Sequence, residues 1–304
     1  MRAVSESRKG LLFGLAAYAL WGAFPLYWPL LEPAGATELL AHRIAWSAVV
    51  MVLLVVAAKR ATHLRAILRS RRRRRLLATA GVVISVNWGV FIWGVNNGHV
   101  VETSLGYFIN PLVTVLFGVL LLGERLRRMQ WVALGLAAVA VLGLAVDYGR
   151  PPWVALTLAL SFGTYGLLKK KADVGAIEGL TVETLVVAPV AVGFLVWLGA
   201  SGHGHALEDP PWHLLLLTTS GVVTALPLIF FGASATRVPL TTLGLLQYVA
   251  PTLQFLLGVF FFHEPMPAAR WLGFALIWLA LALFSADSVR QRQLTRLRVE
   301  ASAL

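Results

Sequence analysis

Ten stretches of mostly apolar residues, each long enough to cross a bilayer as a helix, follow one another along the chain. A helix needs about 20 such residues to span a hydrocarbon core about 30 Å thick. Hydrophobic residues make up 58% of the chain and charged residues 13%, roughly half the charged share of a soluble domain. We therefore predict an all-α integral membrane protein with ten transmembrane helices, at 10–31, 38–58, 76–97, 102–122, 129–147, 152–168, 179–199, 212–235, 240–262 and 267–286.

The positive charges predict the orientation of these helices. The chain carries 26 Lys and Arg residues, including the run "RSRRRRR" at 69–75. With the N-terminus in the cytoplasm, 23 of the 26 fall on the cytoplasmic side, as the positive-inside rule requires. Both termini are therefore expected in the cytoplasm. We interpret the arginine run as an orientation anchor that touches anionic membrane lipid. A site for a protein partner is the alternative, and nucleic acid is not an expected partner.

The two halves of the sequence share a pattern at an offset of 140 residues. Each half holds five predicted helices, so the second half is inverted relative to the first. Inverted repeats around a central site are a recurring architecture of secondary transporters. We expect one five-helix repeat at 1–148, a second at 149–289 and a basic cytoplasmic tail at 290–304. The identical pairs are Pro111 and Pro251, Gly118 and Gly258, Val119 and Val259, Glu124 and Glu264, Trp131 and Trp271, and Asp147 and Asp287.

Motifs spread over the chain carry a family resemblance. They include "AAYALWG" at 16–22, "NWGVFIWGVNN" at 87–97, "ETSLGYFINPL" at 102–112 and "LGLLQYVAPTLQFLLGV" at 243–259. This pattern closely resembles the RarD branch of the EamA transporters, which belong to the drug/metabolite transporter (DMT) superfamily. The resemblance implies a ten-helix permease of the bacterial inner (plasma) membrane, with a central cavity lined by helices 1 to 4 and 6 to 9. It does not identify a substrate, since relatives export amino acids and other metabolites.

Polar side chains in the middle of predicted helices are the candidates for substrate binding, because such groups are costly when they face lipid. They form matched stripes on the fourth and ninth helices, each around a proline that frees a backbone carbonyl. Asn87 and Trp88 on the third helix combine an amide with an aromatic face, which suits an amphipathic organic solute. The alternative is that these groups form interhelical hydrogen bonds. The predicted cavity residues are Asn87, Trp88, Tyr107, Asn110, Gln247, Tyr248 and Gln254.

Ionisable residues within helices are the candidates for proton or charge coupling. His42 and Glu183 lie at related places in the two halves, at an offset of 141, and buried groups of these types titrate near neutrality. Arg43 is a further candidate, which holds a substrate carboxylate or pairs with Glu38 or Glu102. For all three, a helix-end ion pair is the alternative. Glu124 and Glu264, at helix ends, are expected to cap a helix or lock a gate.

These patterns predict a secondary active transporter of small organic solutes, such as metabolites, amino acids or amphipathic drugs, by alternating access around a central cavity. An enzyme is not predicted, because the chain has no His-Glu-x-x-His, Gly-x-Ser-x-Gly or phosphate-binding motif. Cofactors and metal sites are not expected either, since there is no cysteine and "HGH" at 203–205 lacks a third ligand. An intramembrane enzyme acting on a lipid, or a channel, remains the alternative. Oligomeric state, transport direction and coupling ion stay open.

Overall fold

The computed structural model describes residues 2–122, 126–205, 211–235, 237–238 and 246–302. Helices and connecting turns make up this part of the chain, and none of it is a strand. In chain order the elements are α1 (Arg2–Tyr27), η1 (Trp28–Leu31), α2 (Ala36–Ala57), α3 (Ala61–Arg69), α4 (Arg71–Asn96), α5 (Val100–Leu122), α6 (Arg128–Asp147), α7 (Trp153–Ala172), α8 (Ala176–Ser201), α9 (Pro211–Ala235), α11 (Val249–Leu256), η2 (Leu257–Phe261) and α12 (Ala268–Ser302).

Eight helical segments of the described chain are long and apolar enough to cross a membrane. They lie in α1 with η1, α2, α4, α5, α6, α8, α9 and α12. The sixth predicted span, α7, is less apolar because it ends in Lys169, Lys170 and Lys171. The ninth is represented by the shorter helix Val249–Phe261, and residues 240–245 lie outside the described part. The chain is therefore an all-helical multi-pass membrane protein, and the expectation of ten spans is confirmed only in part.

Basic segments that lie outside the predicted spans are also helical. The basic stretch after α2 contains α3, and α4 begins at Arg71, within the arginine run. The Ser70 hydroxyl accepts a hydrogen bond from the Arg73 amide at 3.4 Å, which is the contact that favours serine at a helix N-cap. At the other end of the sequence, the basic tail continues α12 as far as Ser302.

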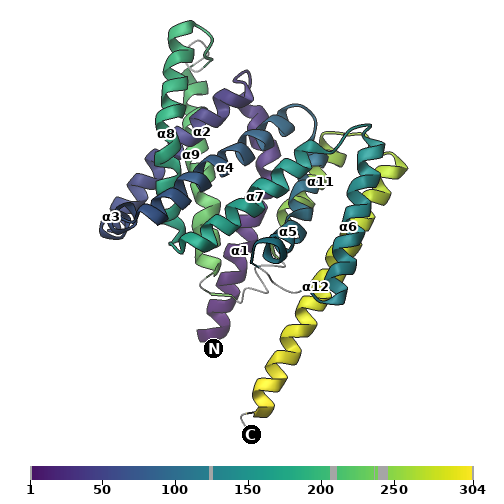
Figure 1. Cartoon of the computed structure of the whole chain (residues 1–304). Coiled ribbons are helices and arrows are strands. Elements are labelled where there is room, and N and C mark those ends of the chain that lie inside the picture. The colour runs from purple at the N-terminus through teal and green to yellow at the C-terminus, as the bar shows by residue number, and fades with distance from the viewer. Residues whose placement is uncertain (1, 123–125, 206–210, 236, 239–245, 303–304) are drawn as a thin grey trace.

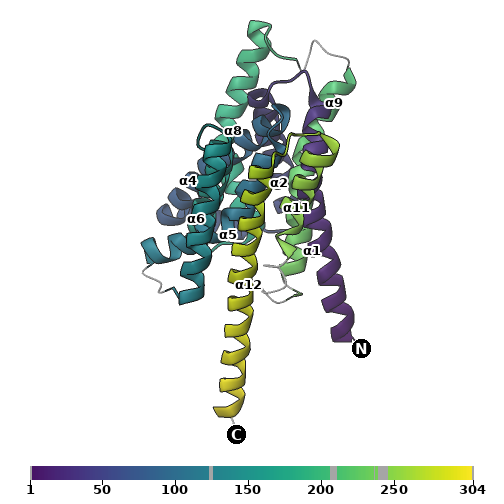
Figure 2. The same cartoon turned by 90° about the vertical axis from the view of Figure 1, so that its right-hand side faces the viewer.

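The helices pack mainly across the two halves of the sequence. α2 lies against α8 and α9, α4 against α7 and α8, and α1 against α9 and α11, while α5 contacts α7 and α11. Figures 1 and 2 show α6 and α12 side by side at one edge of this bundle. Both chain termini lie at the same end of the molecule (Figure 1), which we call the terminal end. The other end is called the opposite end.

Two aromatic clusters hold the helices together. In one, Phe108 on α5, Phe255 on α11 and Phe274 on α12 are all buried, and the rings of Phe255 and Phe274 are 4.7 Å apart. In the other, Trp28 is fully buried among residues of α1, α2, α4 and α9. Large aromatic side chains bury much apolar area each. The clusters therefore fix the positions of α4 and α5, which carry the first candidate site residues.

Charged side chains join α6 and α12 at both ends of the pair. Near the start of α6, the Arg127 Nε donates to the Asp287 Oδ2 at 2.7 Å. At the far end of α6, the Arg270 Nε donates to the Asp147 Oδ2 at 3.1 Å. One pair joins the start of α6 to Asp287 within α12, and the other joins the first turn of α12 to Asp147, the last residue of α6. The two helices are thus held in antiparallel register.

Candidate functional site

Asn87 connects three helices in the middle of the bundle. Its side chain is 1% exposed, and its Nδ2 donates to the Leu158 carbonyl and to the Ser161 hydroxyl of α7, both at 3.0 Å. Its Oδ1 accepts a hydrogen bond from the Tyr107 hydroxyl of α5 at 3.2 Å. The structure thus brings Asn87 and Tyr107 together. In this conformation the amide is satisfied by protein groups, as a buried amide should be.

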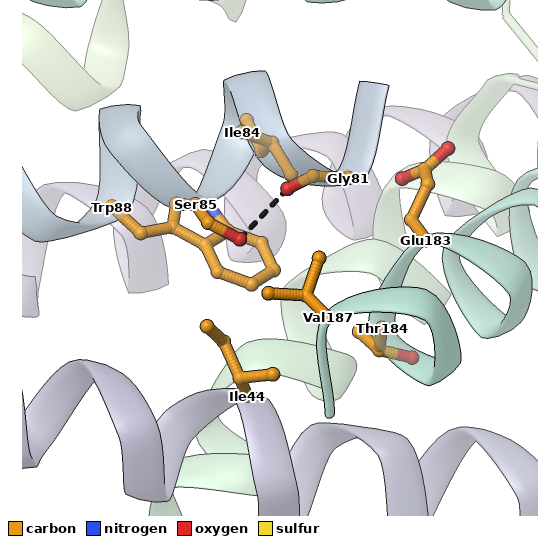
Figure 3. A pocket seen from close by; sticks show the side chains of 8 residues that line it. All are labelled: Ile44, Gly81, Ile84, Ser85, Trp88, Glu183, Thr184 and Val187. Atoms are coloured by element: carbon orange, nitrogen blue, oxygen red, sulfur yellow. Dashed lines mark hydrogen bonds between the residues drawn. The ribbon is translucent and has the colours of Figure 1, made fainter. Parts of the chain in front are cut away.

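Trp88, the next residue of α4, lines a narrow hollow between α2, α4 and α8. Figure 3 shows Trp88, Ile84, Ile44 and Val187 around its centre, with the Glu183 carboxylate turned away from Ile44 and Val187. The Ser85 hydroxyl donates to the Gly81 carbonyl at 2.7 Å, so its hydrogen is already used in a hydrogen bond within α4. The hollow leaves no room for even a water molecule. The Trp88 side chain is half-buried and packs against residues of α2 and α8.

Arg43 lies over the ring of Trp88. Its guanidinium carbon is 4.1 Å from the centre of that ring and 5.0 Å from the ring of Trp28. The ring of Phe24 is 5.6 Å away. The Arg43 Nε donates to the Thr224 hydroxyl at 3.1 Å, and the residue is only 3% exposed. A permanent cation is therefore buried among aromatic rings from α1, η1 and α4.

Glu183 and His42 have different surroundings. The Glu183 carboxylate accepts hydrogen bonds from Lys169 Nζ at 2.7 Å and from the Tyr165 hydroxyl at 2.9 Å, both on α7. His42 is buried on α2, and neither of its ring nitrogens has a hydrogen-bond partner within the described chain. At the offset of 140 that relates the other identities, Arg43 is the counterpart of Glu183. Glu183 therefore lies beside a cation, whereas its counterpart Arg43 lies among aromatic rings.

The candidates on the ninth predicted span do not join Asn87 and Trp88. The Gln254 Nε2 donates to the Trp21 carbonyl of α1 at 3.1 Å, and its Oε1 has no hydrogen-bond partner in the described part. Tyr248 packs against the cluster of α5, α6 and α12, and Gln247 lies half-buried in the turn before α11. On α5, the Asn110 Oδ1 is also without a partner among the described groups. The seven predicted cavity residues therefore make separate contacts, and this structure does not bring all of them together.

Glu264 joins two parts of the opposite end. Its carboxylate accepts hydrogen bonds from the backbone amides of Val100 and, at 3.0 Å, Val101, which are the first amides of α5. A carboxylate is favourable at a helix N-terminus, where the amides have no partner within the helix. Burial raises the pKa of Glu264 above its ordinary value, while the amides of Val101 and Val100 oppose that shift. Glu264 therefore caps α5, whereas its counterpart Glu124 lies outside the described residues.

A second carboxylate at the same end caps α7. Glu102 accepts from two nitrogens of Arg150, at 2.8 and 3.3 Å, and from the Val154 amide at 3.1 Å. The hydrogen bonds from Arg150 to Glu102 raise the pKa of Arg150 above its ordinary value. His99 stacks on Trp93 nearby, and burial lowers the pKa of its imidazole. Glu102 was considered as a partner of Arg43, and the structure gives it a different one.

Two matched carboxylates that were not predicted as site residues join α2 to α8. At the opposite end, Glu38 accepts from the His205 amide and contacts the His205 Nδ1, both at 2.9 Å. At the terminal end, Glu178 accepts a hydrogen bond from the Arg60 Nη1 at 3.1 Å. We call these the Glu38 contact and the Glu178 contact. The sequence holds a signal for them, because the offset of 140 lays "GATE" at 35–38 on "GAIE" at 175–178.

Comparison with known proteins identifies the chain. The EamA-like transporter family matches it over residues 8–146 and again over 151–286. A protein named RarD from Streptomyces exfoliatus is 56% identical over 303 residues, which cover 100% of this chain and 96% of the relative. The chain belongs to the RarD branch of the EamA-like transporter family. It is thus a member of the DMT superfamily and a membrane transporter, as the motifs predicted.

Other relatives agree with this placement. Protein RarD of Escherichia coli (strain K12) is 43% identical over 95% of this chain and 98% of its own. The uncharacterized transporter YojE of Bacillus subtilis (strain 168) is 43% identical over 96% and 98%. A crystal structure at 21% identity shares the fold with a TM-score of 0.56, over 90% of this chain and 96% of the other. Within the described residues, no three His, Asp or Glu side chains gather in a way that would hold a metal ion.

Proposed function

We propose that this protein is a secondary active transporter that moves small organic solutes by alternating access between two inverted five-helix repeats, residues 1–148 and 149–289. The observation that carries the proposal is the pair of Glu38 and Glu178 contacts. The two glutamates are 140 residues apart, and each follows the start of its helix. Each accepts from the segment after the C-terminal end of the other helix. A two-fold axis in the membrane plane produces this exchange of roles.

The packing of the helices supports the same symmetry. With ten spans counted as α1, α2, α4, α5, α6, α7, α8, α9, α11 and α12, the contact of α4 with α7 corresponds to that of α9 with α1. The contact of α5 with α7 corresponds to that of α11 with α1, and the pairs α2 with α8 and α6 with α12 correspond to themselves. The family also matches the chain twice, once in each proposed repeat.

The positions of the Glu38 and Glu178 contacts support alternating access. One joins α2 to the segment after α8 at the opposite end, and the other joins α8 to the segment after α2 at the terminal end. A transporter that opens one side at a time needs a separable closure at each side of its site. The hollow beside Trp88 lies between these same two helices and α4. Opening either end of the α2 and α8 pair would give access to it.

The substrate would bind among the residues around this hollow and along α5 and α11. Trp88 and Tyr107 offer aromatic faces, and Asn87, Asn110, Gln247, Tyr248 and Gln254 offer directed hydrogen bonds once the helices separate. Asn110 and Gln254 each have a buried oxygen without a partner among the described groups, which supports a role that another state completes. Glu183, with its Lys169 partner, and His42 are the proposed proton-coupling groups. Glu264 is the proposed structural cap, with Glu124 as its counterpart.

The proposed location is the bacterial inner membrane, with both termini in the cytoplasm. With the spans alternating in direction from α1, the terminal end receives α3, the arginine run and the lysines that end α7, which fits the positive-inside rule. Reporter fusions should place Gly202 outside and a site after Arg290 inside. A cytoplasmic signal at Gly202 would contradict the inverted arrangement of the repeats.

Transport is tested with the purified protein in liposomes. A panel of metabolites and amphipathic compounds should include a solute that exchanges across the bilayer without ATP, and exchange should saturate. A covalent change in a lipid or solute would instead indicate an intramembrane enzyme. Flux that does not saturate and shows no counterflow would indicate a channel. Either result would overturn the proposal.

A further inference from the structure

Arg43 carries a buried positive charge that the described protein does not neutralise. Its guanidinium is 3% exposed, and its one hydrogen-bonding side chain among the described residues is the neutral hydroxyl of Thr224. Arginine keeps its proton in proteins. A buried charge is costly unless it is paired, and the aromatic rings of Phe24, Trp28 and Trp88 compensate only a part of that cost.

The carboxylates of the described chain that are at least half-buried all have other partners. Five of them pair with arginine or lysine, which are Glu102, Asp147, Glu178, Glu183 and Asp287. Glu38 contacts His205, and Glu264 caps α5. None of them forms an ion pair with Arg43. The matched position in the other repeat is occupied by Glu183, which has its own cation, Lys169. The anion that would pair with Arg43 must therefore come from outside these residues.

The surroundings of Arg43 indicate what that anion is. A guanidinium offers its donors as a planar fork that matches the two oxygens of a carboxylate. Trp88, Trp28 and Phe24 surround it with apolar faces. Arg43 also lies seven residues after the start of α2, or about 10 Å along the helix. The helices α1, α4 and α9 enclose it there, so it does not lie among lipid head groups.

We propose that Arg43 binds the carboxylate of a small organic anion, whose apolar part packs against Trp88, Trp28 and Phe24. This proposal rests on the transport function proposed above and names its substrate class. Trp88 contacts the Arg43 guanidinium and also lines the hollow beside Ile44 and Val187. Once the helices separate there, the substrate would occupy the hollow with its carboxylate on Arg43.

Binding is measured on the full-length protein in detergent, by the ligand-induced rise of the thermal unfolding midpoint. The probes are pairs of a carboxylate and its neutral amide, from acetate and acetamide to phenylacetate and phenylacetamide. We expect at least one carboxylate to bind at least tenfold more tightly than its amide. Arg43→Gln should remove this preference, and Arg43→Lys should retain a part of it. The control Arg65→Gln, an exposed arginine of α3, should behave like the unmodified protein.

Several outcomes would overturn the proposal. They are an absence of preference for the anion in every pair, or a preference that Arg43→Gln leaves intact. Loss of the preference when phosphatidylglycerol is added would assign Arg43 to lipid. If Arg43→Gln does not fold, the carboxylate and amide pairs on the unmodified protein and on Trp88→Leu decide the question. The unmodified protein should bind the carboxylate more tightly than the amide, and Trp88→Leu should weaken binding of the phenyl compounds more than that of acetate.

Counterflow in liposomes separates this proposal from the general one. One result would be that the protein exchanges neutral or cationic solutes but no carboxylate, and that Arg43→Gln exchanges them at the same rate. This result would support the transport function and contradict the anion site. Anion-specific binding in detergent together with no exchange of any solute would keep the anion site and contradict the transport function.

Discussion

Gly81 and Gly221 stand 140 residues apart, and each brings the backbone of its helix against the backbone of another. A Cβ atom at Gly81 on α4 would lie 2.7 Å from the Glu183 carbonyl oxygen of α8. One at Gly221 on α9 would lie 2.5 Å from the Trp46 carbonyl oxygen of α2. Small residues allow such close approaches between membrane helices. The contact of α4 with α8 at Gly81 thus corresponds to the contact of α9 with α2 at Gly221, as the proposed symmetry requires.

Gly81→Ala and Gly221→Ala should therefore both destabilise the protein. The added methyl group meets backbone, which cannot rotate away, so each substitution should cost about 1–3 kcal/mol and lower the thermal unfolding midpoint in detergent. Gly193→Ala on α8 is the control, because nothing lies within 4 Å of a Cβ there. Equal midpoints for all three variants would show that α4 and α8 do not approach as closely as described.

Glu38→Gln and Glu178→Gln should shift the conformational equilibrium in opposite directions. The chain has no cysteine, so a single cysteine at Val187 in the hollow reports access to a membrane-impermeant maleimide. A change of about 1 kcal/mol alters a two-state ratio about fivefold. We expect faster labelling from outside in Glu38→Gln and slower labelling in Glu178→Gln. Labelling that changes in the same direction in both variants would mean that the two contacts do not close different sides.

The two ion pairs of α6 and α12 should differ in their effect on stability. Arg270 and Asp147 are 14% and 10% exposed, while Arg127 is 40% exposed. Arg270 also lies over the Tyr148 ring at 4.3 Å. Arg270→Ala leaves a mostly buried carboxylate without a cation and should cost about 1–3 kcal/mol. Arg127→Ala should cost less than about 1 kcal/mol. Unfolding midpoints measure both, and the reverse order would contradict the burial described.

Glu183 provides the test of proton coupling. If its carboxylate exchanges a proton with Lys169 or solvent during the cycle, Glu183→Gln should abolish flux driven by a pH gradient. Counterflow exchange of the same solute should persist, because it needs no net proton movement. His42→Ala is the parallel variant for the other candidate. Normal pH-driven flux in both variants would show that these residues serve the structure alone.

His99 should make stability depend on pH at the opposite end. Burial lowers the pKa of its imidazole, the nearby Glu102 carboxylate opposes the shift, and Arg150 and Arg270 add to it. The unfolded chain therefore binds this proton more tightly than the folded protein. The contribution of neutral His99 to the free energy of unfolding is fully present above pH ~6.5. It is lost as the pH falls through the lowered pKa. His99→Asn should reduce the fall of the unfolding midpoint between about pH 8 and pH 5.

The membrane class and most helix positions follow from the sequence because they depend on long apolar runs. The start of α4 was missed, since five consecutive arginines do not fit an apolar pattern even though Ser70 caps the helix there. α3 was missed for the same reason. The three lysines of α7 lie within a predicted connection, but the structure includes them in the helix and gives Lys169 a carboxylate partner.

The candidate site was harder to predict, because contacts between helices depend on the rotation and tilt of each helix. The pairing of Asn87 with Tyr107 joins two residues that the sequence had already singled out. Tyr248, one residue from Gln247, instead faces the cluster of α5, α6 and α12. A stripe of polar residues identifies the polar face of one helix, but it does not identify the neighbouring helix that packs against that face. Glu38 was considered only as a partner of Arg43, and the exchanged partners of Glu38 and Glu178 depend on the packing of α2 against α8.

The ion pairs of α6 and α12 have a consequence for how such a chain can evolve. Arg127 and Asp147 belong to the first half of the sequence, and each is neutralised by a residue of the second half, Asp287 and Arg270. A copy of either half, expressed alone, would expose both charges without their partners. A substitution at Arg270 or Asp147, the more buried pair, creates selection for a change in the other half of the sequence. At this pair the two halves are therefore constrained to change together and not as independent modules.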